Sequence, residues 1–278
     1  MPKIAFFGTP AFAAESLKAL CAAGFTPQVV ITAPDKPQGR KQIVTPSAVK
    51  TWATEYGLPI ETPASLKDFS LPGDWDLFII VAYGKLIPNR LLALPAFGAL
   101  NVHGSLLPHL RGASPIQGAL LEGYKETGIT IMQIDAEMDH GPIVAQEACT
   151  IGEHETYQTL HDALAEKGAA LLAKIVPDWI TGKITAQEQN HAAATYTKKI
   201  STKDAEIDLA TMSPEEVDRR IRALNPNPGT FTYFTIKGKS VRTKLLEAHL
   251  ENGELILDTV QPEGKTPVPW KQFKERVQ

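Results

Sequence analysis

The first two-thirds of the chain alternate short apolar runs with stretches of helical spacing. The apolar runs end near glycine or proline, which is typical of buried strands. The stretches between them repeat apolar residues every three or four positions and begin at a capping residue or end at a glycine, which is typical of helices. Strands are predicted at 3–8, 27–34, 76–84, 98–104, 128–134 and 141–151, and helices at 11–24, 47–57, 114–123 and 155–182.

This alternation of strands and helices predicts an open, mostly parallel, Rossmann-like α/β sheet. The run "DLFIIVAYG" at 76–84 is the most apolar strand and is expected at the centre of that sheet. The strands at 128–134 and 141–151 are close enough in sequence to pair as a hairpin. The helix at 47–57 has Ser47 as its expected N-cap and Gly57 just beyond its end.

The pattern changes after Gly182. Residues 183–203 show little apolar periodicity and are predicted to be a linker. A short helix follows, with Ser213 at its N-cap and Pro214 at its first helical position. Short alternating runs separated by "KGK" and "ENG" turns then predict β-hairpins. We therefore expect a large α/β domain at 1–182 and a small β-rich domain at 204–278, joined by the linker 183–203.

Composition narrows the class of protein without identifying a site. The 278 residues are 43% hydrophobic and 21% charged, which is ordinary for a soluble globular protein. The net charge of -3 argues against nonspecific coating of nucleic acid and leaves room only for a local basic patch. Cys21 and Cys149 lie far apart without a metal-binding spacing, and no apolar run is long enough for a signal peptide or a membrane span. These features predict a cytoplasmic protein without a membrane segment.

One glycine-containing motif, "FFGTPAFAA", ends the first predicted strand. Dinucleotide-binding folds place G-x-G-x-x-G there, but the second and third glycines are absent after Gly8. NAD or FAD binding is therefore not supported. The loop is still expected at the carboxyl end of the sheet, where ligands bind in open α/β folds.

The stretch "NVHGSLLPHLRG" places polar side chains at the end of a buried strand. Asn101 and His103 are two residues apart, so both side chains point to the same face if the strand continues to His103. A carboxamide and an imidazole together at the carboxyl end of a strand favour a catalytic site over packing. Tyr83, at the end of the strand 76–84, suits packing and ligand contact equally well.

A polar loop, "DAEMDHGP", separates the last two strands predicted in the large domain. Acidic side chains in loops are mostly solvated or cap turns. Asp135, Glu137, Asp139 and His140 all compete as candidates for a functional role there. Their spacing alone does not select one of them.

Two long motifs carry a family resemblance. The stretches "NVHGSLLPHLRGASPIQGALLEG" and "ETGITIMQIDAEMDHGPIVAQ" resemble the folate-dependent formyltransferases. The further stretches "FFGTPAFA", "PDKPQGR", "TPSAVK", "VAYGKLIP" and "QPEGK" extend the resemblance over nearly the whole chain. Among them, "GTPAF" and "PSAVK" favour the members that act on methionyl-tRNA over those that act on sugar amines or glycinamide ribotide.

The resemblance implies a role for each group of candidate residues. It implies catalytic roles for Asn101, His103 and Asp139, and so selects Asp139 in the polar loop. The folate-binding residues that it implies are Ser105, Leu106, Leu107, Pro108, Tyr83 and Gly84. The loop that would contact tRNA keeps Lys36, Arg40 and Lys41 and then turns apolar.

The resemblance also implies the reaction, which is formyl transfer from 10-formyltetrahydrofolate to the methionine amino group of initiator methionyl-tRNA. The amine attacks a carbonyl through a tetrahedral oxyanion, which needs hydrogen-bond donors where the charge develops. Asn101 can donate, and His103 can donate when protonated, a form that a nearby Asp139 carboxylate favours. One of the pair must relay the proton from the amine to the leaving folate nitrogen. No metal or protein partner is implied, and a monomer is expected.

Two alternatives remain open. From Asp204 onward, 11 Lys and Arg stand against 12 Asp and Glu, and this domain is expected to be a shortened OB-like fold. A formyltransferase for a small amine, such as an amino-sugar nucleotide, would keep Asn101, His103 and Asp139 beside a reduced second domain. A non-catalytic folate-binding or RNA-binding relative would not need that intact set, which argues against the second alternative.

Overall fold

The computed structural model describes residues 1–39 and 42–277, and the contacts within it divide the chain into two compact units. Unit 1 comprises residues 1–111, 127–149 and 161–196, and unit 2 comprises residues 112–126, 150–160 and the chain from 197 onward. Each unit has its own cluster of buried apolar side chains.

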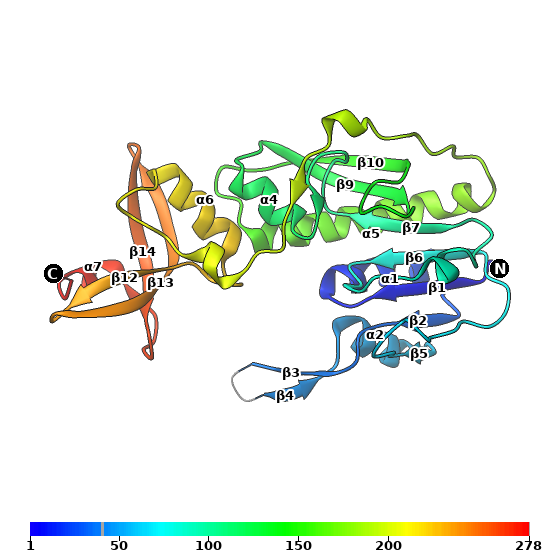
Figure 1. The fold of residues 1–278 in the computed structure, drawn as a ribbon, viewed down its shortest axis with the longest axis horizontal. Coiled ribbons are helices and arrows are strands. Elements are labelled where there is room, and N and C mark those ends of the chain that lie inside the picture. The colour runs from blue at the N-terminus through cyan, green and yellow to red at the C-terminus, as the bar shows by residue number, and fades with distance from the viewer. Residues whose placement is uncertain (40–41, 278) are drawn as a thin grey trace. The chain divides into compact units, whose positions relative to one another are not determined.

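Unit 1 is built on a seven-stranded sheet of order β10-β9-β7-β6-β1-β2-β5 (Figure 1). Its strands are β1 (Ile4–Gly8), β2 (Val29–Ile31), β5 (Ile60–Glu61), β6 (Leu77–Val81), β7 (Ala99–His103), β9 (Glu126–Gln133) and β10 (Ile143–Thr150). The strands from β7 to β5 run parallel, and β9 pairs antiparallel with β7. β6 takes the middle position and is buried at every residue. The predicted open, mostly parallel sheet is confirmed.

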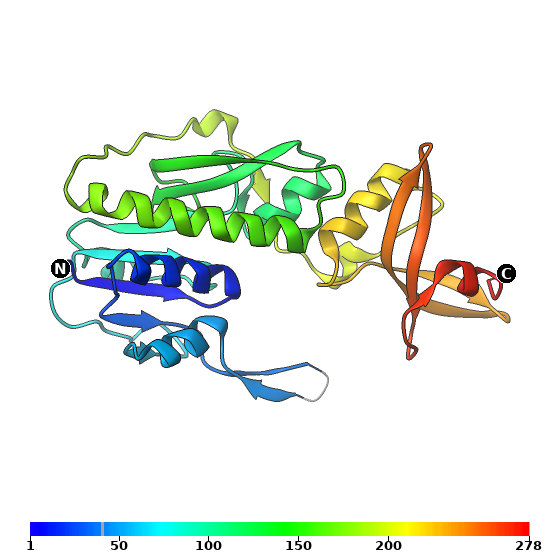
Figure 2. The ribbon, with the colours of Figure 1, turned by 180° about the vertical axis from the view of Figure 1, so that it is seen from behind.

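Helices α1 (Ala11–Ala22) and α5 (Tyr157–Ile180) lie side by side on the face of this sheet that is turned toward the viewer in Figure 2. α5 approaches β7 closely at Gly168, where an added Cβ would stand 3.0 Å from Val102 Cγ1. None of the described helices combines the length and the apolar composition needed to cross a bilayer.

The caps that the sequence predicts for α2 (Ala48–Tyr56) are present. Ser47 Oγ accepts a hydrogen bond from the Lys50 N–H at 3.0 Å and satisfies one of the donors left over at the helix start. Gly57 ends the helix with φ at +78°, a left-handed conformation that favours glycine. A further short helix, α3 (Asn89–Leu92), follows the end of β6.

A short hairpin was not predicted from the sequence. It consists of β3 (Lys36–Gln38) and β4 (Ile43–Thr45), which pair antiparallel. Its strands are only three residues long and contain no alternating pattern, so periodicity gave no signal for them. The apolar side chains of Ile43 and Val44 are 61% and 64% exposed on it.

The first part of the predicted linker packs against unit 1. Residues 183–196, which we call the strap, contain the 3-10 helix η1 (His191–Ala193). The Gln187 backbone exchanges two hydrogen bonds with Ile143 at the start of β10, at 2.7 and 2.8 Å. The strap leads into β11 (Tyr196–Thr197), which pairs with β8 (Arg111–Gly112).

Unit 2 contains the small antiparallel sheet that the sequence predicts at the C-terminal end. Its elements are α4 (Pro115–Leu121), the 3-10 helix η2 (Thr202–Ala205), α6 (Pro214–Leu224), β12 (Phe231–Ile236), β13 (Lys239–Glu251), β14 (Glu254–Pro262), β15 (Val268–Pro269) and α7 (Trp270–Lys274). The four strands pair in the order β12-β13-β14-β15. Ser213 caps α6 by accepting from the Glu216 N–H, and Val217 and Ile221 join α6 to the core of this sheet.

Candidate active site

The carboxyl ends of β1, β6 and β7 meet at one edge of the sheet, because the three strands are parallel neighbours. The turns after β1 and β6 are joined there, since Thr9 Oγ1 donates to the Tyr83 carbonyl at 3.2 Å. Gly8 allows α1 to start at once, because a Cβ at this position would stand 2.7 Å from Ala13 Cβ. The "FFGTPAF" motif therefore forms a tight strand-to-helix turn.

Asn101 and His103 point away from α5. Val102 between them contacts Gly168 of that helix, and successive side chains of a strand alternate between the two faces of the sheet. Asn101 is half-buried, and His103 is 6% exposed at the last residue of β7. The two side chains that the sequence places on one face are thus held at the carboxyl end of one strand.

His103 contacts two groups through its two ring nitrogens. Its Nε2 lies 3.1 Å from the Leu110 carbonyl oxygen, which can only accept, so Nε2 carries a proton. Its Nδ1 lies 3.6 Å from Asp139 Oδ1, which is an ion-pair distance and too long for a direct hydrogen bond. Nδ1 is therefore the nitrogen that can take up or release a proton beside a carboxylate.

The structure distinguishes the four candidates in the polar loop. Asp139 faces His103, with its side chain 15% exposed. Asp135 instead accepts a hydrogen bond from His140 Nδ1 at 2.6 Å, and Glu137 is exposed. Asp139 adopts a left-handed conformation with φ at +51°, which turns the loop toward the end of β7. The contact that distinguishes Asp139 from the other three is the one with His103. It joins two distant parts of the chain, so the spacing of the candidates could not reveal it.

Gly141 lets this loop return close to β9. A Cβ at Gly141 would overlap the carbonyl oxygen of Gln133, which is backbone and cannot rotate away. Gly141→Ala is expected to displace the loop and lower turnover by at least about tenfold, since small displacements of catalytic groups are costly. Gly152→Ala is the matched control, because its new Cβ would only reach the end of the Glu155 side chain at 3.4 Å. Equal turnover of the two variants would contradict the expectation.

The turn at 105–108 is anchored to the last two strands of the sheet. Leu107 N–H donates to Thr130 Oγ1 of β9 at 3.0 Å, and the same hydroxyl donates to the Ser105 carbonyl at 2.7 Å. Gln146 Nε2 of β10 donates to the Leu107 carbonyl at 2.8 Å. The turn is therefore held by hydrogen bonds to its backbone.

The side chains of this turn divide into buried and half-buried ones. Ser105 is fully buried and donates to the His109 carbonyl at 2.6 Å, and Leu107 is 3% exposed. Leu106 and Pro108 are half-buried. Among the four residues of this turn that the resemblance assigns to folate, Ser105 and Leu107 thus support the turn from within. A charged substitution at Leu107 would disturb the folding of the turn, because a charge would be buried there, and so would not report on ligand contact alone.

Tyr83 and Gly84 form the turn at the end of β6. The Tyr83 ring is 4% exposed and packs edge-on against Phe7, with ring centroids 5.7 Å apart. Its hydroxyl is buried without a hydrogen-bond partner among the described residues, and burial raises the pKa of Tyr83. An unpaired buried hydroxyl costs about 1–3 kcal/mol. Such a group suits a site that a polar ligand or an ordered water completes.

Of the three residues assigned to tRNA, the structure describes Lys36. Lys36 is exposed on β3, whereas Arg40 and Lys41 lie outside the described residues. Burial, and secondarily the positive charge of Lys36, lowers the pKa of Lys85, which follows the turn after β6.

Sequence reasoning missed the groups that support the site. The Leu110 carbonyl orients His103, and Leu110 itself has a left-handed backbone with φ at +59°. Its N–H donates at 2.8 Å to Thr195 Oγ1, which belongs to the strap. The strap was predicted to be a linker because it has no apolar periodicity. Its residues pack through directed polar contacts, which leave no periodic signal.

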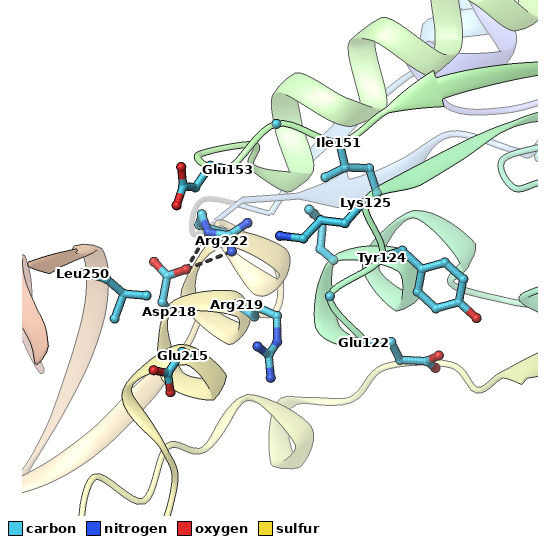
Figure 3. Close-up of a pocket in the computed structure, with 13 residues that line it drawn as sticks. Glu122, Tyr124, Lys125, Ile151, Glu153, Glu215, Asp218, Arg219, Arg222 and Leu250 are labelled. Carbon is cyan, nitrogen blue, oxygen red and sulfur yellow. Dashed lines mark hydrogen bonds and ion pairs between the residues drawn. The ribbon is translucent and has the colours of Figure 1, made fainter. Parts of the chain in front are cut away.

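A cavity of about 430 Å³ lies within unit 2, between the end of α4 and α6 (Figure 3). Its basic side chains, Lys125, Arg219 and Arg222, are outnumbered by four acidic ones. Arg222 forms an ion pair with Asp218 at 2.8 Å, which Figure 3 shows, and donates a hydrogen bond to the Glu155 carbonyl at 2.8 Å. This mixed lining does not form a basic groove. Among residues 1–39 and 42–277, no three His, Cys, Asp or Glu are grouped to hold a metal ion.

Two family models match the chain. The model described as "Formyl transferase" matches residues 2–176, and the model described as "Formyl transferase, C-terminal domain" matches residues 199–256. The first match includes every predicted catalytic and folate-binding residue.

Two curated proteins similar to the chain align with nearly all of it. The methionyl-tRNA formyltransferase of Methylococcus capsulatus is 38% identical over an alignment 297 positions long, gaps included. The alignment covers 98% of this chain and 96% of the relative. The methionyl-tRNA formyltransferase of Bacillus thuringiensis is 40% identical and covers 98% and 95% of the two chains.

Solved structures share the fold at lower identity. Methionyl-tRNA formyltransferase from Clostridium thermocellum superposes with a TM-score of 0.60 at 17% identity, covering 94% of this chain and 99% of that one. The N-formyltransferase from Helicobacter canadensis, in complex with folinic acid and dTDP-3-aminofucose, superposes with a TM-score of 0.68 at 18% identity, covering 97% and 99%. These likenesses establish the fold alone.

Proposed function

Because this chain belongs to the formyl transferase family, we propose that it transfers the formyl group of 10-formyltetrahydrofolate to the methionine amino group of initiator methionyl-tRNA. The observation that carries this proposal is the identity of 38% over 98% of the chain with a relative named for that activity. The N-formyltransferase from Helicobacter canadensis, at 18% identity, is similar at the level of the fold alone. The domain limits at 182 and 203, the monomeric state and the cytoplasmic location stay predictions.

The proposed chemistry uses a neutral amine as nucleophile. The amine nitrogen forms a bond to the formyl carbon, and the carbonyl oxygen becomes an oxyanion. The bond between that carbon and N10 of the folate then breaks. Since the amine loses a proton and N10 gains one, the whole reaction moves one proton between two nitrogens. Both compounds are consumed, so the folate is a substrate of the reaction and not a resident cofactor.

His103 and Asp139 are suited to move that proton. In the proposal, Nδ1 of His103 takes it from the attacking amine and gives it to the leaving nitrogen. The imidazolium that forms between the two steps lies 3.6 Å from the Asp139 carboxylate, which stabilises it. The Leu110 carbonyl keeps the proton on Nε2 and so leaves Nδ1 for the reaction.

Asn101 is suited to stabilise the oxyanion. It lies two residues before His103 on the same face of β7, and its amide can donate two hydrogen bonds. A donor fixed on a strand needs little reorganisation when the charge develops, which is the condition for effective stabilisation of a transition state.

The proposed folate site lies on the turns that flank this pair. The turn at 105–108 follows His103 directly, and the turn with Tyr83 and Gly84 ends the neighbouring strand. The unpaired Tyr83 hydroxyl supports the proposal that a polar ligand completes this edge of the sheet.

A competition between two acceptors tests the proposed function. With 10-formyltetrahydrofolate as donor, the chain is expected to formylate charged initiator tRNA, and to act on an amino-sugar nucleotide at least about 10²-fold less efficiently, since the small amine lacks the remote contacts that orient the substrate. Product formation with each acceptor is measured by mass spectrometry. A preference for the amino sugar would transfer the assignment to the sugar-amine class.

The same assay, repeated at increasing salt concentration, tests whether the chain contacts tRNA phosphates. Each phosphate contacted by a cation such as Lys36 makes binding fall with ionic strength. For three such contacts, kcat/KM on tRNA is expected to fall at least about tenfold between about 50 and 200 mM salt. Activity that does not depend on salt would contradict phosphate contact.

A further inference from the structure

The strap holds the acceptor that orients His103. Thr195 Oγ1 accepts from the Leu110 N–H at 2.8 Å, and the Thr195 carbonyl accepts from the Arg111 N–H at 2.9 Å. Leu110 is the residue whose carbonyl accepts from His103 Nε2. Thr195 of the strap therefore holds the backbone of Leu110, and the Leu110 carbonyl in turn orients the imidazole of His103.

The strap also holds the loop that carries Asp139. Gln189 is 5% exposed, and its Nε2 donates to the carbonyls of Asp139 at 2.9 Å and Gly141 at 2.7 Å. Its Oε1 accepts from Arg111 Nη2 at 2.6 Å and Nε at 3.2 Å. Arginine only donates and carbonyls only accept, so the orientation of the amide is settled by its neighbours. All four hydrogen-bonding positions of Gln189 are in use.

Arg111 makes this arrangement rigid. It is 2% exposed, and its Nη2 also lies 2.9 Å from His191 Nδ1 of the strap. A buried guanidinium gives short, charge-assisted bonds of fixed direction. It also polarises the Gln189 amide, which strengthens the two bonds that the amide donates on its other side.

We propose that Gln189, held by Arg111, is a positioning residue that sets the Asp139 carboxylate at its distance from His103. The inference rests on the proposed function, in which this pair moves a proton. Asp139 has a left-handed backbone, a conformation that is uncommon for residues other than glycine and that bonds to the flanking carbonyls can stabilise. The bonds from Gln189 reach the backbone of Asp139 itself and of the residue two positions on, so they can stabilise it.

Gln189→Glu is the test variant. Glutamate keeps the size of the side chain and the acceptor for Arg111, but it replaces two donors by an oxygen that faces two carbonyl oxygens. We expect kcat to fall at least about tenfold, because displacing a catalytic group by about 1 Å or less lowers the rate on this scale. In an Asp139→Asn background the same substitution should lower kcat less than about threefold, because its effect acts through the Asp139 carboxylate.

Gln187→Glu is the matched control, since Gln187 is exposed two residues earlier on the same strap. Hydrogen exchange of peptides covering 135–142 provides a readout that needs no substrate. Exchange should be faster in Gln189→Glu than in wild type and unchanged in Gln187→Glu. If Gln189→Glu does not fold, Arg111→Lys keeps the charge, loses the planar fork and should change exchange and kcat in the same direction.

Either of two results would overturn the inference. One is exchange at 135–142 that is the same in Gln189→Glu and Gln187→Glu. The other is an equal loss of kcat in the wild-type and Asp139→Asn backgrounds, which would show that Gln189 acts on folding in general. If the wild type formylates no amine, the proposed function fails, and the exchange measurement still decides whether Gln189 holds the loop.

Discussion

Replacing His103 by Ala is expected to lower kcat for formyl transfer by about 10²- to 10⁴-fold, the range of lost general acid–base help. The reason is geometric. His103 is 6% exposed, its Nε2 is engaged by the Leu110 carbonyl, and its Nδ1 is the protonatable atom that faces Asp139. Without it, a proton must leave the amine and reach the folate nitrogen through water. Steady-state kinetics with saturating donor measures the effect.

Two further variants separate chemistry from folding in this experiment. His103→Ala leaves the Leu110 carbonyl without its donor, whereas His103→Gln offers an amide N–H in place of the imidazole N–H. A loss common to both variants follows from the missing proton carrier. His109→Ala is the matched control, because His109 is an exposed histidine of the same segment. Near wild-type turnover in His103→Gln would exclude proton transfer by His103.

The elements that the sequence predicted are those whose signal is local. Ser47 and Ser213 cap the helices that follow them, as short-range hydrogen bonding dictates. β6 is continuous in its apolar residues and therefore takes the centre of the sheet. Asn101 and His103 share a face because a strand repeats every two residues. None of these conclusions needs knowledge of a distant contact.

The features that escaped prediction depend on contacts between distant segments. Asp139 could not be chosen from its spacing, because the partner that distinguishes it lies 36 positions earlier, at His103. The strap offered no apolar pattern, since Gln189 and Thr195 act through hydrogen bonds to backbone atoms. A chain cut at Gly182 would therefore lose groups that support the candidate active site, even though the sequence predicts a linker there.

The turn at 105–108 shows a second kind of difficulty. A resemblance assigns a motif to a ligand without saying which side chains face it. In the structure, Ser105 and Leu107 are buried and support the turn, while Leu106 and Pro108 are half-buried. Ligand contact is therefore better tested through the backbone and the half-buried positions than through Leu107.

Asp139→Asn is expected to lower kcat by about 10²-fold with little change in folding. Two unit charges about 4 Å apart attract by about 4 kcal/mol at an effective dielectric constant near 20. Asp139 Oδ1 and His103 Nδ1 are 3.6 Å apart and largely buried, so losing much of this attraction accounts for the 2.7 kcal/mol or so that a 10²-fold change in rate requires. Asparagine keeps the shape of aspartate, and Glu137→Gln, on the exposed part of the same loop, is the control. If Asp139→Asn turned over as fast as Glu137→Gln, the carboxylate would not stabilise the imidazolium, and the proposed role of Asp139 would be wrong.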